Sequence, residues 1–149
     1  MNTEHPIVFQ HMHVDICYIH NPQHRDGNPN KTQWTINEID ERSCFQFAGR
    51  LKYEQNCELS TTCWGIHVTN GRVCALGKSA VKSSAPIYDL IIAKFVDGNA
   101  NHKWHGYPAD HEANIQDIPP ECVRSSWLKS GYLTAAKIRK ISRGQRCRL

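Results

Sequence analysis

Three histidines lie within a short aromatic stretch of the second half of the chain, Asn101–His111. Imidazole exchanges protons near neutral pH, and two imidazoles, or an imidazole with an ammonium group, can cleave a phosphodiester without a metal ion. We interpret the stretch as a surface loop whose catalytic candidates are His102, His105, His111 and Lys103. Its aromatic residues Trp104 and Tyr107 are candidates for stacking on a base or sugar ring. The alternative is a rigid turn that closes one end of the core, with solvated histidines.

A second group of functional side chains is His11-x-His13-x-Asp15. In an extended strand the side chains at i, i+2 and i+4 leave the same face, so two imidazoles and a carboxylate would converge as tentative ligands for zinc, manganese or iron. Further ligands would have to come from distant histidines. The alternative is a solvated polar face of the strand. Apart from a divalent transition metal on the first interpretation, we expect no cofactor.

Positive charge is concentrated at the C-terminal end of the chain. No acidic residue follows Glu121, and the remaining residues carry eight of the eighteen basic side chains, a net charge of +8. Residues 1–121 hold ten basic and fourteen acidic side chains, a net charge of −4. Such asymmetry indicates an anionic partner, whether nucleic acid, a membrane surface or an acidic protein.

The basic tail has the pattern of two short helices. Asp117 is the expected cap of the first helix, Val123 and Trp127 share one of its faces, and Gly131 ends it. A second helix is expected from about Thr134 to Arg143. Arginine donates two hydrogen bonds to a phosphate, and neutralised phosphates release counterions. The candidate nucleic-acid contacts are Arg124, Lys129, Lys137, Arg139, Lys140 and Arg143. The alternative is a solubilising helical hairpin folded on the acidic body.

The elements that position these groups are predicted from local patterns. β-Branched and aromatic residues predict a strand at Ile7–Ile19, and Thr35 with Glu38 predicts a capped helix at Ile36–Arg42. Strand-like composition returns at Phe45–Tyr53. Asn70-Gly71 is a strong hairpin signal, and the apolar run Ile87–Val96 predicts a buried central strand.

Seven cysteines at wide spacings, together with an N-terminus that lacks a secretory signal pattern, favour free thiols in a reducing compartment. Cys17, Cys44 and Cys122 are the expected core positions among them. No apolar run is long enough to cross a bilayer. We therefore expect a cytoplasmic protein.

The length and composition predict a single α+β domain: an antiparallel or mixed sheet, one early helix and a C-terminal basic helical pair. The leading functional expectation is a small nucleic-acid-associated protein that holds the phosphate backbone with its tail and contacts or processes the strand with the histidine-rich stretch. One alternative is a metal-dependent hydrolase that uses His11, His13 and Asp15. Another is a regulator or inhibitor that docks on an acidic protein partner.

Overall fold

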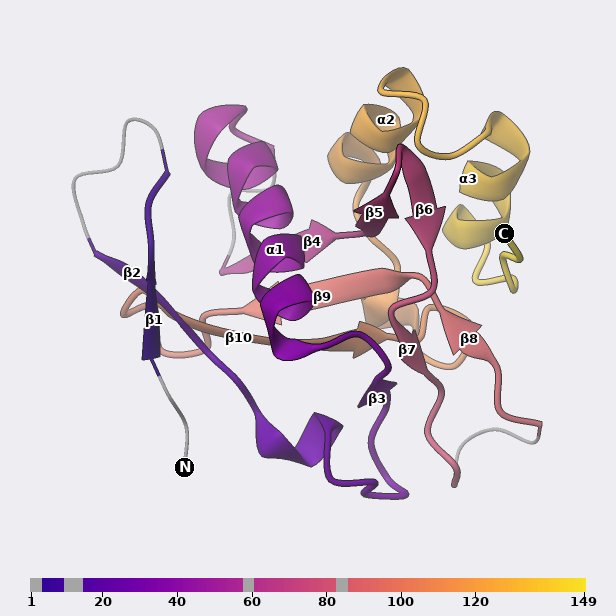
Figure 1. Cartoon of the computed structure of the whole chain (residues 1–149). Coiled ribbons are helices and arrows are strands. Elements are labelled where there is room, and N and C mark those ends of the chain that lie inside the picture. The colour runs from indigo at the N-terminus through magenta and orange to yellow at the C-terminus, as the bar shows by residue number, and fades with distance from the viewer. Residues whose placement is uncertain (1–3, 10–14, 58–60, 83–85) are drawn as a thin grey trace.

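The computed structural model describes residues 4–9, 15–57, 61–82 and 86–149. Within these residues the main sheet has five strands in the order β1 (Glu4–Ile7), β2 (Ile16–Ile19), β10 (Lys103–Ala109), β9 (Ile92–Val96) and β4 (Thr62–Gly65) (Figure 1). β10 runs parallel to β2, and the other neighbours are antiparallel. The sheet is therefore mixed, and the predicted α+β class is confirmed.

Smaller elements complete the fold. A second sheet joins β3 (Gln33–Trp34), β7 (Gly77–Lys78) and β8 (Asp89–Leu90), and a hairpin joins β5 (His67–Thr69) to β6 (Arg72–Cys74). The helices are α1 (Glu38–Gly49), which continues into a wider turn η2 (Arg50–Glu54), and the C-terminal pair α2 (Glu121–Lys129) and α3 (Ala135–Ser142). Two short helical turns are η1 (Pro22–His24) and η3 (Ile115–Asp117).

The N-terminal segment forms a hairpin instead of the predicted single strand Ile7–Ile19. β1 and β2 pair in antiparallel register, with Glu4 opposite Ile19 and Ile7 opposite Ile16. The chain therefore reverses direction between the two strands. The prediction is wrong at this point because composition reports strand preference without reporting where a strand turns back.

The early helix is longer than predicted and begins later. Asn37, not Thr35, is its N-cap, with the side chain accepting a hydrogen bond from the Asp40 amide at 2.8 Å. The helix then continues through residues whose composition predicted a strand, Phe45–Tyr53, so that prediction is wrong. Phe45 and Ala48 are buried against the main sheet, and this packing outweighs the weak local preference of an aromatic residue for strands.

Two of the predicted β elements are confirmed. Asn70 and Gly71 have φ values of 52° and 75° at the tip of the β5–β6 hairpin, as a tight two-residue turn requires. The run Ile87–Val96 contains two strands: β8, at the edge of the second sheet, and β9, which lies between β10 and β4 in the main sheet. The expected central strand is therefore β9 alone, in which Ile92, Ala93 and Phe95 are buried.

The histidine-rich stretch is a strand, β10, and not the expected loop. Its side chains alternate: Trp104, Gly106 and Pro108 are buried, whereas Lys103 is exposed and His105 is half-buried. Gly106 allows the Phe95 ring of β9 to lie directly against the backbone, in space that a Cβ atom would occupy. Gly106 and Pro108, which suggested a turn, are therefore buried residues of a central strand.

The basic helical pair is confirmed. Val123 and Trp127 are buried on one face of α2, and Gly131, at φ 77°, lies just beyond its end. The expected cap is wrong, because Pro120 is the N-cap of α2. The Asp117 carboxylate is buried instead, where it accepts hydrogen bonds from the Tyr107 hydroxyl and the Asp110 amide.

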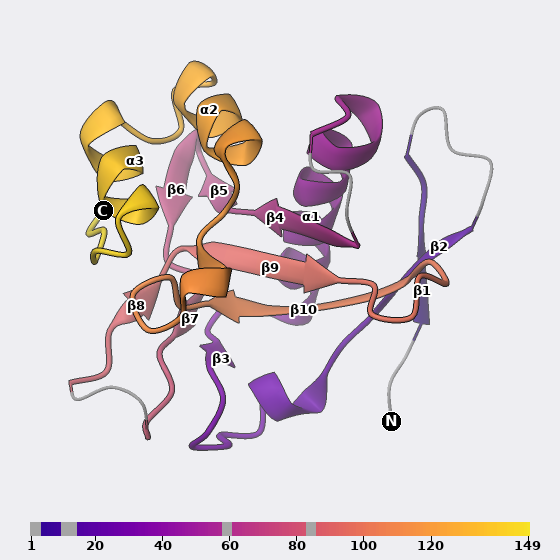
Figure 2. The same cartoon turned by 180° about the vertical axis from the view of Figure 1, so that it is seen from behind.

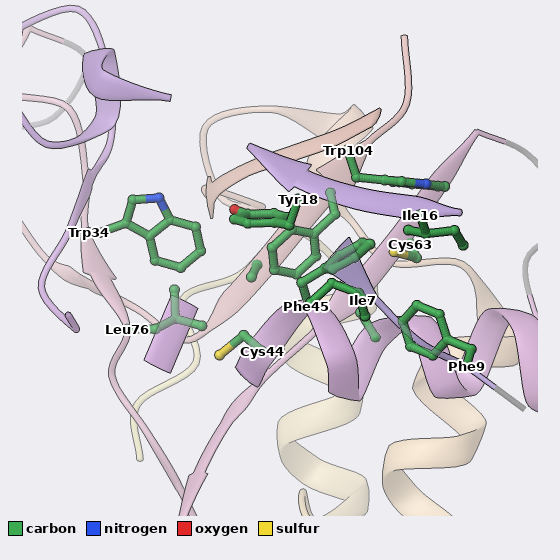
Figure 3. Packing of buried hydrophobic residues seen from close by; sticks show 13 residues of the cluster. Ile7, Phe9, Ile16, Tyr18, Trp34, Cys44, Phe45, Cys63, Leu76 and Trp104 are labelled. Atoms are coloured by element: carbon green, nitrogen blue, oxygen red, sulfur yellow. The ribbon is translucent and has the colours of Figure 1, made fainter. Parts of the chain in front are cut away.

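Buried side chains form two clusters in the described part of the chain. The first lies between α1 and the main sheet, where the aromatic rings of Tyr18, Phe45, Phe95 and Trp104 contact one another (Figure 3). The second lies beneath α2 and α3 and joins Trp127 and Ile141 to residues of β4 and β9. Seen from behind, β9 and β10 lie in front of α1, which confirms that this helix covers one face of the sheet (Figure 2).

The cysteines only partly follow the expectation of free thiols. Cys44 is buried as expected and Cys17 is half-buried, whereas Cys122 is exposed and forms a disulfide with Cys57, 65 residues earlier. Disulfides persist mainly in oxidising compartments, so this bond weighs against the expected cytoplasmic location. None of the helices in the described part of the chain has the length and apolar character of a membrane span.

Candidate functional site

The four catalytic candidates of the histidine-rich stretch do not converge on one point. His102 precedes β10 and His111 follows it, and at about 3.3 Å per residue the two ends of this seven-residue strand are about 20 Å apart. Lys103 donates to Glu4 at 2.8 Å, and the His111 Nε2 atom donates to the Gln145 carbonyl at 2.7 Å. The four side chains therefore do not meet at one point, although Lys103 and His105 share one side of β10, and the expected acid–base pair stays a prediction.

The two aromatic candidates face opposite sides of the strand. Trp104 is 1% exposed and packs against Phe45 and Tyr53, so its ring presents no face to an external base. Tyr107 is half-buried, and its ring stacks on that of His24 with centroids 5.4 Å apart. Burial raises the pKa of the Tyr107 hydroxyl, which donates to Asp117.

His105 lies on the same side of β10 as Tyr107. Burial lowers the pKa of its imidazole, an effect that the negative charge of Asp97 partly offsets. The positive charge of His105 would also act on His24 and lower its pKa, so these two rings are electrostatic neighbours. The structure thus brings His105 and Tyr107 towards His24 and leaves His102 and His111 at the two strand ends.

The tentative metal ligands are only partly described. His11 and His13 lie outside the described residues, and Asp15 is exposed immediately before β2. Among the described residues no three His, Cys, Asp or Glu side chains are close enough to hold a metal ion. The metal interpretation of His11, His13 and Asp15 therefore stays a prediction.

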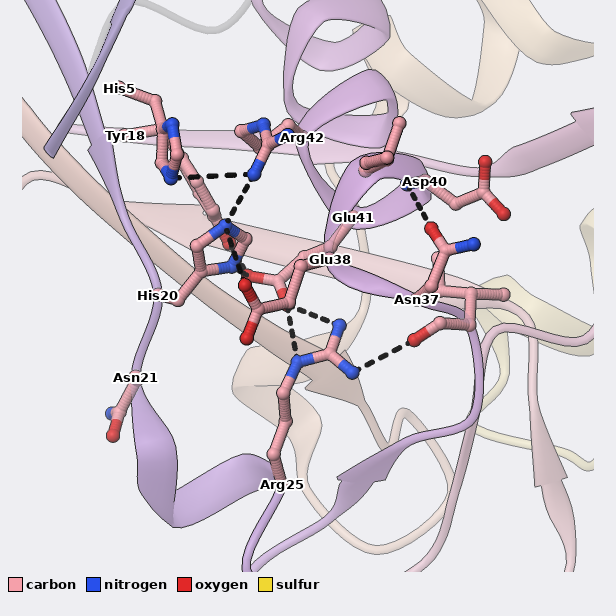
Figure 4. A network of polar contacts seen from close by, with 12 residues as sticks. His5, Tyr18, His20, Asn21, Arg25, Asn37, Glu38, Asp40, Glu41 and Arg42 are labelled. Atoms are coloured by element: carbon pink, nitrogen blue, oxygen red, sulfur yellow. Dashed lines mark hydrogen bonds and ion pairs between the residues drawn. The ribbon is translucent and has the colours of Figure 1, made fainter. Parts of the chain in front are cut away.

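A buried polar network centred on Glu41 was not foreseen. The Glu41 carboxylate is 1% exposed and accepts hydrogen bonds from the Tyr18 hydroxyl, from His20 Nδ1 at 2.9 Å, and from Arg25 at 2.7 and 3.0 Å (Figure 4). Its partners come from β2 and from the residue after η1, whereas Glu41 belongs to α1. The polar spacing Tyr18-x-His20 on one strand was the available signal, but nothing in the sequence pairs it with a helical glutamate.

The Glu41 network is internally satisfied. With Nδ1 donating to Glu41, His20 Nε2 accepts from Arg42 at 3.1 Å, and the same guanidinium reaches His5 at 3.3 Å. Both ring nitrogens of His20 are therefore occupied by the protein itself. This arrangement supports a role in positioning β1, β2 and α1, and leaves no free group for an external ligand.

The outer surface of the helical pair carries the candidate phosphate contacts. On α3, Ile141 is buried and Ile138 half-buried towards the second cluster. The cations of α3 and its C-cap are Lys137, Arg139, Lys140 and Arg143. The last three are exposed, whereas Lys137, one turn before the buried Ile141, is half-buried. Lys129 is exposed at the end of α2, and Arg124 is half-buried with its Nε atom unpaired. We call these six side chains the basic surface.

The described carboxylates of the same chain form no ion pair with the basic surface. Among described residues, the tail cation with a carboxylate partner is Arg146, which contacts Glu112 at 3.0 Å and lies over the Tyr88 ring. The residues of the basic surface have no ion pair with any described carboxylate. Their charge is therefore available to an external anion.

No protein-family model, no curated protein and no solved structure matches this chain.

Proposed function

We propose that this protein binds the phosphate backbone of nucleic acid through the basic surface on α2 and α3. The observation that carries the proposal is that six cations of the helical pair lack carboxylate partners among the described residues, although residues 1–121 have a net charge of −4. A folded domain gains no stability from uncompensated like charges, which repel one another. An anionic partner supplies the compensation.

The side chains of α3 favour a phosphate backbone over an acidic protein. The outward side of this helix presents small alanines and cations, while its isoleucines turn inward. Protein interfaces usually contain a central apolar or aromatic region, which this side of the helix lacks. Backbone recognition needs only cations in register with phosphates, since most of the free energy comes from counterion release.

The proposal is tested by replacing Arg139, Lys140 and Arg143 with Gln in the full chain. Fluorescence anisotropy with a labelled single strand of mixed sequence, between about 50 and 200 mM salt, should show weaker binding for every sequence used. If each side chain neutralises one phosphate, the slope of log K against log salt should become shallower by about 2, at roughly 0.7 per phosphate of a single strand.

The matched control removes exposed cations from another part of the surface. Lys78 and Lys82 are exposed on and after β7, and their replacement by Gln lowers the net charge without touching the helical pair. This variant should keep the wild-type salt slope. A triple variant that binds as tightly as the wild type, or a control that weakens binding equally, would refute the basic surface as the contact region.

A further inference from the structure

A polar cavity of about 430 Å³ opens beside the end of β10. Its lining includes His24, Lys31, Tyr107, Asn114, Gln116 and Asp117, which come from η1, the loop after it, β10, and the turn η3 with its flank. This volume is within the range of sites for small molecules. The lining includes exposed side-chain amides and one exposed ammonium group, together with the buried imidazole of His24 and the buried carboxylates of Asp110 and Asp117.

His24 lines this cavity and has one ring nitrogen without a hydrogen-bond partner among the described residues. The residue is 7% exposed, and its Nδ1 atom donates to the Thr32 carbonyl at 2.8 Å. That bond orients the ring, and Tyr107 stacks on it. The remaining nitrogen, Nε2, has no hydrogen-bond partner among the described residues. Burial lowers the pKa of His24, so the neutral ring presents Nε2 as an acceptor.

Hydrogen bonds between residues of this protein fix part of the cavity lining, and other lining side chains make no such bond. Asp117 accepts from Tyr107 and from the Asp110 amide, both at 3.0 Å, and the Thr32 hydroxyl donates to the Pro108 carbonyl at 2.7 Å. The side-chain amides of Asn114 and Gln116 have no protein partner in the described part of the chain. These amides are therefore available to hydrogen-bond to a ligand in the cavity.

The cavity lies next to the end of the basic helix α3. Immediately after the cavity residue Asp110, His111 donates to Gln145 at 2.7 Å and Glu112 pairs with Arg146 at 3.0 Å. Gln145 and Arg146 follow Arg143, the last member of the basic surface on α3. Ile115, which lies in sequence between the lining residues Asn114 and Gln116, is 83% exposed.

We propose that this cavity receives one unstacked base of a single-stranded nucleic acid whose backbone lies on the basic surface. The amides of Asn114 and Gln116 and the His24 Nε2 atom would hydrogen-bond to the edge of the base, and Ile115 would contact its face. The proposal rests on the function proposed above. It adds that the protein binds a nucleic-acid strand that carries bases more tightly than an abasic strand of the same length.

The test uses two short labelled strands of equal length and charge, one with bases and one in which every internal nucleotide is abasic. Anisotropy with the full chain should show about tenfold tighter binding of the strand with bases, since contacts to one base are worth about this factor. His24→Ala should reduce that preference to near unity and leave affinity for the abasic strand unchanged.

Two further variants guard against misfolding and nonspecific effects. The rim variant Asn114→Ala with Gln116→Ala changes exposed side chains and should also reduce the preference, without removing a buried ring. Gln23→Ala, an exposed position on the same turn as His24, should keep the wild-type preference. The basic-surface triple variant should weaken both strands by the same factor.

The outcomes separate the two proposals. Equal affinity of the wild type for both strands would overturn the cavity proposal and leave backbone binding intact. A preference that survives both His24→Ala and the rim variant would assign base contacts to another part of the surface. Absence of binding to either strand would overturn both proposals.

Discussion

At the scale of single residues, the Glu41 carboxylate determines how α1 meets the N-terminal strands. A buried carboxylate is costly unless its charge is compensated and its oxygens are hydrogen-bonded. Tyr18, His20 and Arg25 together meet both requirements. Burial and the neighbouring Glu41 charge raise the pKa of the Tyr18 hydroxyl, so this group stays protonated and can donate to the carboxylate.

We predict that Glu41→Gln lowers the free energy of unfolding by about 3 kcal/mol, because it leaves the Arg25 charge uncompensated in a partly buried position. Urea denaturation monitored by fluorescence measures this change. The control is Glu38→Gln, three residues earlier on α1, where the carboxylate is exposed and 3.8 Å from His20. It should change stability by less than about 0.5 kcal/mol, and an equal loss in both variants would contradict the role given to Glu41.

At the scale of elements, the two sides of β10 have different surroundings. Its buried side carries Trp104 and Gly106, which pack against α1 and β9, and its other side presents His105 and Tyr107 towards η1. The period of two along a strand separates these roles. A substitution on the buried side should therefore affect stability, and one on the other side should affect the cavity.

Gly106→Ala is expected to lower the free energy of unfolding by about 2 kcal/mol, since overpacking of a filled core typically costs about 1 to 3 kcal/mol. The added methyl group would enter the space of the Phe95 ring and approach the Lys94 carbonyl. Gly98→Ala is the matched control, because nothing lies within 4 Å of a Cβ atom built there. Thermal and urea unfolding of the two variants should differ clearly, and similar stability would show that the Phe95 ring moves without cost.

At the scale of the whole molecule, charge segregation and covalent connection act on the same part of the chain. The helical pair carries the basic surface, and the Cys57–Cys122 disulfide joins the start of α2 to the segment after η2. The second cluster of buried side chains also packs α2 and α3 against β4 and β9. The cations are thus held on a fixed platform and not on a mobile tail.

Replacement of both Cys57 and Cys122 by Ser should lower the free energy of unfolding by about 4 kcal/mol, the chain-entropy value for a closed loop of this length. Denaturation with and without a reductant measures the effect, and the double variant should be insensitive to the reductant. Cys74→Ser, at a half-buried free thiol, is the control and should retain that sensitivity. A wild type whose stability is unchanged by reductant would show that the bond contributes nothing.

Features that depend on residues close in sequence were determined by the sequence alone. The Asn70-Gly71 turn needs only two residues that accept positive φ, and the C-terminal ends of α2 and α3 follow from the glycines just beyond them. The separation of a +8 tail from a −4 body is likewise a property of the sequence. The α+β class follows from these local patterns taken together.

Only the tertiary structure decided which distant residues meet. The sequence did not show that Phe45–Tyr53 is helical, that Asn101–His111 is a central strand, or that His24 lies beside Tyr107. Nor did it pair Glu41 with His20 and Arg25, or Cys57 with Cys122. The physical reason is that burial and pairing free energies between distant segments exceed local propensities of about 1 kcal/mol per residue, and they depend on contacts that no short sequence window contains.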